Sequence, residues 1–202
     1  FCVVSVVCRP FIGWMLDNGK RKMILAVGLL GMLLMPLGYL FLHTLVLAFV
    51  CRMVHGAALA FSNTSTATIA TDSVPRSRFA EGMGIFGLAT ALATAVAPAI
   101  GLALMEKCGF SVLFLFGSLS IALALVLFFL LKAPNIAVEK KPLSLKGLFD
   151  KNAVPASLTA VVFMFTYGAL ENFAAKFAAE KGLPSGGLFF VIMAVTVLIM
   201  RM

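Results

Sequence analysis

Long runs of hydrophobic residues alternate with short polar connections along almost the whole chain. Seven apolar segments can be delimited, at residues 1–16, 23–42, 45–71, 82–105, 110–131, 154–175 and 186–200. About 20 apolar residues, at a rise of ~1.5 Å each, cover the ~30 Å hydrocarbon core of a bilayer. The pattern therefore predicts seven membrane-spanning helices, with residue 1 already inside the first of them.

Composition supports this prediction. The 202 residues are 62% hydrophobic and 12% charged, with a mean hydropathy of +1.09, whereas soluble domains contain about 25% charged residues. We therefore expect an all-α, polytopic helical membrane protein. The four cysteines, Cys2, Cys8, Cys51 and Cys108, have no spacing that indicates disulfides.

The net charge of +8 is explained by the side of the membrane on which the basic residues lie. Connections 17–22, 72–81 and 132–153 carry Lys20, Arg21, Lys22, Arg76, Arg78, Lys132, Lys140, Lys141, Lys146 and Lys151. The other three connections carry only Lys107, Lys176 and Lys181. By the positive-inside rule the first set is cytoplasmic, so nucleic acid is not an expected partner.

The long connection at 132–153 is polar and contains Pro134 and Pro142. It is typical of a linker between two helical units. We expect an N-terminal bundle at 1–131, a cytoplasmic linker at 132–153 and the start of a C-terminal bundle at 154–202. A long loop within a single bundle is the alternative.

The connection after the first segment carries a specific charge pattern. Gly13 precedes Asp17 by four residues, and Arg21 and Lys22 follow. A glycine there allows two helices to approach closely, and the basic residues offer the carboxylate partners. The spacing resembles the loop between helices 2 and 3 of the major facilitator superfamily, although Asn18 and Lys20 depart from the family motif.

In the family this loop steadies one transport state through its charges. The resemblance therefore implies a cytoplasmic charge network, which Asp72 and Arg78 of the next basic connection would join. A solvated turn in which Asp17 is only a helix cap or a loop charge is the alternative.

The third segment carries a second match to the superfamily. Arg52, His55 and Gly56 fall where helix 4 of the family has Arg, a polar residue and Gly. At 100° per residue they share a stripe with Asn63. Because Arg is costly inside a membrane, we expect Arg52 to face a cavity or partner; the alternative is that it extends to the headgroups.

The fourth segment carries small residues at intervals of four, which favour close helix packing. Ala93, Ala97, Pro98 and Gly101 resemble the helix 5 motif of antiporters in the superfamily, with alanines in two glycine positions. Because small residues at this spacing occur in many bundles, the order of the three motifs adds more weight than this one alone.

The resemblance implies a fold of twelve helices, of which this chain holds about seven, from helix 2 to helix 8. It implies a secondary transporter that moves a small solute by alternating access, by proton-coupled efflux, in the plasma membrane. Neither enzyme activity, a cofactor nor a metal is expected, and no phosphate-binding Gly-x-x-x-x-Gly-Lys loop is present. A seven-helix receptor and a non-transporting scaffold remain alternatives.

Glu171 is a candidate proton carrier. It ends an uncharged run and shares a helical face with Tyr167. Burial below the outer surface would favour its protonated form. The alternative is an interfacial Glu balanced by Lys176.

Overall fold

The described elements of this computed structural model are all helical, as the sequence predicts. The structure describes residues 1–19, 21–41, 44–130 and 153–182, and scattered positions between 189 and 199. It divides into two compact units, one of residues 1–79 and 108–149, the other of residues 80–107 and 150–202. We describe each unit by itself.

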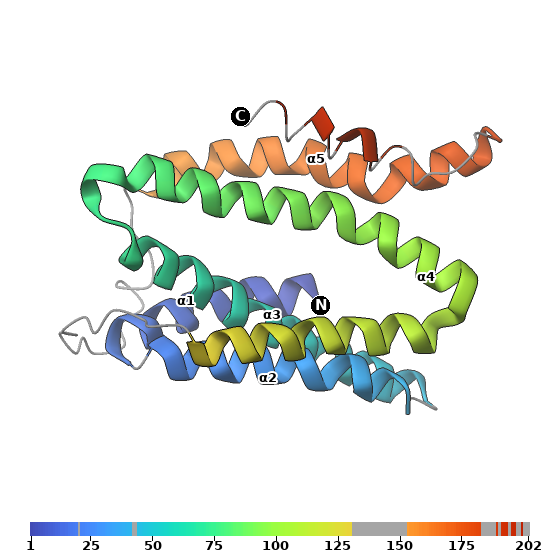
Figure 1. Cartoon of the computed structure of the whole chain (residues 1–202), viewed down its shortest axis with the longest axis horizontal. Helices are drawn as coiled ribbons and strands as arrows, with labels where there is room; N and C mark the ends of the chain where they lie inside the picture. Colours follow the sequence, from blue (N-terminus) through green and yellow to red (C-terminus); the bar gives the residue numbers. More distant parts are fainter. Residues whose placement is uncertain are drawn as a thin grey trace. The chain divides into compact units, whose positions relative to one another are not determined.

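The first unit is built on three helices, α1 (Cys2–Asn18), α2 (Arg21–Tyr39) and α3 (Leu45–Ser73), which lie close together in Figure 1. Both α1 and α2 pack on α3. Ile12 and Leu16 of α1 are each 1% exposed and meet Ile24 of α2 and Ala60 of α3 in one buried cluster. Apolar side chains thus hold together the ends of α1 and α2 that flank the charged turn.

The contact between α2 and α3 is close enough to involve the backbone. A Cβ atom on Gly28 would lie 2.5 Å from the amide nitrogen of Ser62, and one on Gly31 would lie 2.6 Å from Cβ of Ala58. A Cβ on Gly56 of α3 would similarly lie 2.5 Å from the Phe1 carbonyl oxygen. Small residues therefore set how closely these helices approach.

The element α4 (Phe79–Leu130) is interrupted at Gly109, which has φ 81° and ψ 176°. A positive φ of this kind is readily adopted only by glycine. Because these angles are not helical, one helix ends before Gly109 and another begins after it. Two spans were predicted here, at 82–105 and 110–131, and the structure confirms them. A short 3-10 helix, η1 (Arg76–Arg78), precedes α4.

The second half of α4 belongs to the first unit. Leu25 and Leu29 of α2 and Ile69 of α3 form a buried cluster against Ala124, Leu125 and Phe128. The buried Ser118 hydroxyl also donates to the Leu33 carbonyl of α2, at 3.3 Å. Residues 110–130 therefore pack as a further helix on α2 and α3.

The second unit contains the first half of α4 and α5 (Val154–Glu180). The helix α5 extends past the predicted segment 154–175, because residues 176–181 contain neither Gly nor Pro and Gly182 follows them. Gly182 has φ 66°. The seventh segment is described only in part, with helical residues at 189, 191–193, 195, 196 and 199. Residues 132–152 and Arg201 lie outside the described residues, so the division at the linker stays a prediction.

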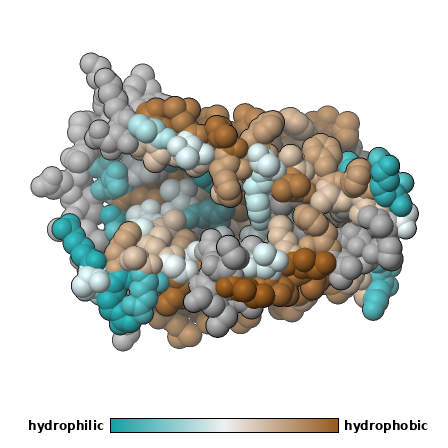
Figure 2. All heavy atoms as spheres, turned by 90° about the horizontal axis from the view of Figure 1, so that it is seen from above, coloured by the Kyte–Doolittle hydropathy of each residue, from teal (hydrophilic) through white to brown (hydrophobic). Residues whose placement is uncertain are grey.

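In the described part of the chain, four helices are long and apolar enough to cross a membrane: Arg21–Tyr39, Leu45–Ser73, Arg76–Leu130 and Val154–Ala174. The third includes both halves of α4, on either side of Gly109. In Figure 2 hydrophobic residues cover much of the length of the helices, and strongly hydrophilic residues gather toward their ends. The chain is therefore an integral membrane protein.

Candidate functional site

Two polar clusters lie at opposite ends of α2, each between α2 and α3. One contains Arg21 and Asp72, at the start of α2 and the end of α3, and the other contains Tyr39 and His55. Arg21 and Tyr39 are the first and last residues of α2, so the clusters are roughly 27 Å apart along it at ~1.5 Å per residue. That distance is close to the thickness of the hydrocarbon core.

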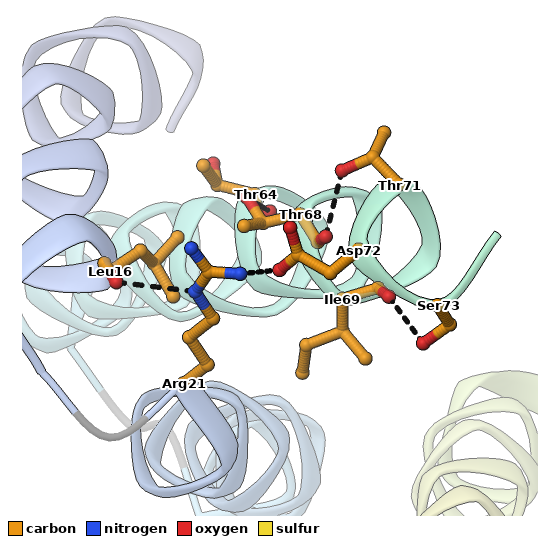
Figure 3. A network of polar contacts seen from close by, with 8 residues as sticks. All are labelled: Leu16, Arg21, Thr64, Thr68, Ile69, Thr71, Asp72 and Ser73. Atoms are coloured by element: carbon orange, nitrogen blue, oxygen red, sulfur yellow. Dashed lines mark hydrogen bonds and ion pairs between the residues drawn. The ribbon is translucent and has the colours of Figure 1, made fainter. Parts of the chain in front are cut away.

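At the first end the Arg21 guanidinium joins three helices. Its Nη1 atom pairs with Oδ2 of Asp72 on α3, and its Nε–H donates to the Leu16 carbonyl on α1, at 3.4 Å. Figure 3 shows the side chain reaching from α2 to a position between these two acceptors. The Leu16 carbonyl lies in the last turn of α1, where the helix itself supplies no donor. Arg21 therefore links α1, α2 and α3 with one charged group.

The hydroxyl groups around Asp72 bond to their own helix. Thr71 donates to the Thr68 carbonyl at 2.7 Å, and Ser73 donates to the Ile69 carbonyl at 2.7 Å (Figure 3). Arg21 and Asp72 are each 18% exposed. Because the pair is mostly shielded from water, its attraction is screened less than that of a surface pair.

The neighbouring basic residue makes a different contact. The Lys22 ammonium lies over the Phe128 ring of α4, 5.4 Å from its centroid, within the range of a cation–π interaction. The two adjacent basic residues at the start of α2 thus contact different helices. Arg21 contacts α1 and α3, and Lys22 contacts the second half of α4.

Two other members of the predicted charge network are exposed. Asp17 is exposed on α1, and the described part of the chain places no cation within ion-pair distance of it. Arg78 is exposed in η1. Arg21 and Asp72 were both predicted members, and the structure brings them together; the participation of Asp17 and Arg78 stays a prediction.

Gly13 faces a different direction from the packed side of α1. A Cβ atom there would meet no other atom within 4 Å among the described residues, because the helix packs through Ile12 and Leu16 and Gly13 lies 100° around the helix from Ile12. A close helix approach at Gly13 stays a prediction. Close approach occurs at Gly28, Gly31 and Gly56.

At the second end, α2 and α3 are joined by a hydrogen bond between side chains. Tyr39 Oη lies 2.8 Å from Nδ1 of His55. The Arg52 guanidinium lies 5.6 Å from the centroid of the Tyr39 ring and 5.8 Å from that of Phe1. Arg52 and His55, two of the predicted translocation residues, thus belong to one cluster.

Further aromatic rings extend this cluster. The Phe1 and His55 rings meet edge to face at 5.4 Å, and the Tyr39 ring lies 5.4 Å from that of Phe114, on the second half of α4. Sequence reasoning did not identify Phe1, Tyr39 or Phe114. A usable signal was present for Tyr39, because it is one of only two tyrosines in the chain and lies within the apolar segment 23–42.

The remaining residues of the predicted stripe on α3 have separate roles. Gly56 packs against the Phe1 backbone, as a helix-packing residue should, whereas Asn63 is exposed. The Thr66 hydroxyl donates to the Ser62 carbonyl of its own helix, at 2.8 Å. A cavity beside Arg52 stays a prediction.

For the candidate residues in the second unit, the structure gives the helix position and, for most of them, the exposure. Ala93 and Ala97 are exposed, while Pro98 and Gly101 are half-buried, and α4 stays helical through Pro98. Packing of this face stays a prediction. Tyr167 is half-buried on α5, and Glu171 lies one turn further along the same helix, with its side chain outside the described set.

Comparison with known proteins adds one finding to this geometry. The family model described as Major Facilitator Superfamily matches residues 1–202, the whole length of the chain. No curated protein and no solved structure matches it.

Proposed function

The chain belongs to the major facilitator superfamily, a family of membrane transporters, and from this premise we propose that it moves a small solute by alternating access. Family membership favours a transporter over the receptor and scaffold alternatives. We further propose that transport is driven by an ion gradient, by proton-coupled efflux across the plasma membrane.

The observation that carries this proposal is the Arg21 junction. One guanidinium links α2 to Asp72 of α3 and to the Leu16 carbonyl of α1. The attraction between two mostly shielded charges disappears when they separate. It can therefore stabilise one arrangement of these helices over another, which alternating access requires.

The basic connections indicate the side of the membrane on which the Arg21 junction lies. Arg21 and Asp72 lie at the ends of their helices next to the connections richest in Lys and Arg, which the positive-inside rule assigns to the cytoplasm. In the proposed cycle the pair stabilises the state that is closed on the cytoplasmic side, and Gly13 and Asp17 of α1, Lys22 of α2 and Arg78 of η1 take part in the same network.

Proton coupling and efflux are supported by two features of the sequence. Pro98 and Gly101 keep part of the antiporter-type pattern in helix α4. Glu171 lies within α5 one turn from the half-buried Tyr167. A carboxyl group at such a position can exchange a proton during the cycle, and we assign it this role.

The experiment uses the protein in proteoliposomes that enclose a pH-sensitive dye. Solutes from separate classes, such as ethidium, glucose, citrate and a peptide, are added one at a time while internal pH is followed. A protein-dependent proton flux triggered by one solute class supports the proposal. If no solute moves protons or is itself transported, the proposal is wrong.

The variant Glu171→Gln separates proton coupling from transport itself. It should abolish the solute-driven pH change but retain exchange of labelled solute across the membrane. The matched control is Glu180→Gln, because Glu180 is the last residue of the same helix and is exposed. A normal pH response in Glu171→Gln would exclude this carboxyl group as the proton carrier.

A further inference from the structure

Arg52 is a cation placed in the apolar part of α3. Uncharged runs at 23–51 and 53–71 surround it in the sequence, and it lies about 10 Å from the start of α3 at ~1.5 Å per residue. Its side chain is exposed in the structure, as are those of Arg9 and Arg76, and a charge that faces the apolar part of a membrane is stable only with a partner. Among the described residues no carboxylate lies within ion-pair distance of Arg52.

Two aromatic rings nevertheless flank the guanidinium. Its central carbon lies 5.8 Å from the Phe1 ring centroid and 5.6 Å from that of Tyr39. Such contacts attract the cation and restrict its movement. The rings accept no conventional hydrogen bonds from its five N–H groups, which match the two oxygens of a carboxylate.

His55 and Tyr39 place further polar groups beside the guanidinium. His55 is one helical turn from Arg52 on the same face of α3, and its Nδ1 atom lies 2.8 Å from the Tyr39 hydroxyl oxygen. When Tyr39 donates to Nδ1, the neutral imidazole carries its own proton on Nε2. The ring then has an N–H donor that the bond to Tyr39 does not use.

We propose that Arg52, with Tyr39 and His55, forms a subsite for the carboxylate group of an organic anion. Arg52 supplies the charge and paired N–H donors, His55 supplies a neutral donor, and Tyr39 positions both through its ring and hydroxyl. The aromatic rings of Phe1 and Phe114 suit an apolar group attached to the carboxylate. This inference rests on the proposed function, because it names a substrate class for the transporter.

Binding can be measured without transport. The protein in lipid nanodiscs is titrated with radiolabelled benzoate at pH 8, and benzamide serves as the neutral analogue of the same shape. We expect saturable benzoate binding, with benzamide unable to compete. Arg52→Gln should weaken binding about tenfold or more, and Arg52→Lys less, since Lys keeps the charge but loses the paired donors.

Arg9→Gln is the matched control, because Arg9 is an exposed arginine in the apolar helix α1. It should bind benzoate as the unmodified protein does. If Arg52 only extends to the headgroups, Arg52→Gln will bind benzoate normally and the subsite is disproved. Absence of saturable binding to the unmodified protein also overturns it.

A measurement on the unmodified protein covers the case in which Arg52→Gln fails to fold. Phenylglyoxal modifies arginine, and peptide mass spectrometry reports each site separately. Benzoate should protect Arg52, and not the exposed Arg76, while benzamide protects neither; equal labelling of Arg52 with and without benzoate contradicts the proposal. Since neither assay needs solute movement, failure of the transport experiment leaves both readouts intact.

Discussion

Gly28 and Ser62 lie so close together that a Cβ atom on Gly28 would be 2.5 Å from the Ser62 backbone nitrogen. A backbone atom cannot move aside as a flexible side chain can. We therefore expect Gly28→Ala to destabilise the packing of α2 on α3 by roughly 1–3 kcal/mol, as overpacking does. Thermal unfolding in detergent should show a lower midpoint.

Gly38→Ala is the control for this prediction, because a Cβ atom at Gly38 of the same helix meets nothing within 4 Å. Alanine also has a higher helix propensity than glycine, so Gly38→Ala should leave the midpoint unchanged or raise it slightly. Equal midpoints for the two variants would show that the close contact does not limit stability.

The second prediction concerns the pair formed by Arg21 and Asp72. Asp72→Asn leaves a mostly shielded guanidinium without its counter-charge. The cost should fall between that of a surface pair and that of a fully buried one, roughly 1–3 kcal/mol. We expect labelling of single cysteines at the ends of α1 and α3 next to Arg21 to increase, because the junction opens more often.

The charge exchange Arg21→Asp with Asp72→Arg tests the pair itself. If attraction between these positions is the cause, the double variant should recover part of the original labelling pattern, whereas each single variant should not. A double variant that labels as strongly as the worse single one would indicate that the two sites act separately.

The third prediction concerns Asp17. Asp17→Asn should alter the balance of inward-open and outward-open forms while leaving membrane insertion intact, if Asp17 joins the cytoplasmic network during the cycle. Because Asp17 is exposed, we expect a smaller change in cysteine labelling than Asp72→Asn produces. Unchanged labelling together with unchanged transport would indicate that Asp17 is only a solvated charge.

The fourth prediction concerns Ser118. Ser118 is buried, with a relative exposure of 5% for the whole residue. Its hydroxyl group donates a hydrogen bond to the Leu33 carbonyl of α2. Pro36 of α2 removes the backbone donor of the Met32 carbonyl, next to Leu33, so the Ser118 bond adds a donor to a turn that has one fewer. Ser118→Ala should cost about 1 kcal/mol, seen as a lower unfolding midpoint, whereas the exposed Ser120→Ala should have little effect.

Much of the fold was predictable because helix length and apolarity are local properties. Both helices within α4 were anticipated, because the charged residues Glu106 and Lys107 separate two long uncharged runs. The glycines at which helices approach closely were harder to predict from the sequence. A glycine such as Gly13 cannot be distinguished by spacing alone from Gly28, since the face that meets a neighbour depends on how the helices are oriented.

The two polar clusters were likewise predictable only in part. Arg21, Asp72, Arg52 and His55 could be selected because charged or titratable groups are rare beside long apolar runs. That Arg21 pairs with Asp72 could not be deduced, because the pairing depends on the relative lengths and alignment of α2 and α3. The contact of Tyr39 with His55 was missed for the same reason.

The hydrogen bond from Ser118 to Leu33 also has a consequence for the timing of biosynthesis. The two residues are 85 positions apart, and a ribosome adding roughly 5–20 residues per second needs on the order of ten seconds to make that length. Throughout this interval the Leu33 carbonyl has only its backbone partner within α2. The tie between α2 and the second half of α4 is therefore made only after residues 110–130 have been synthesised.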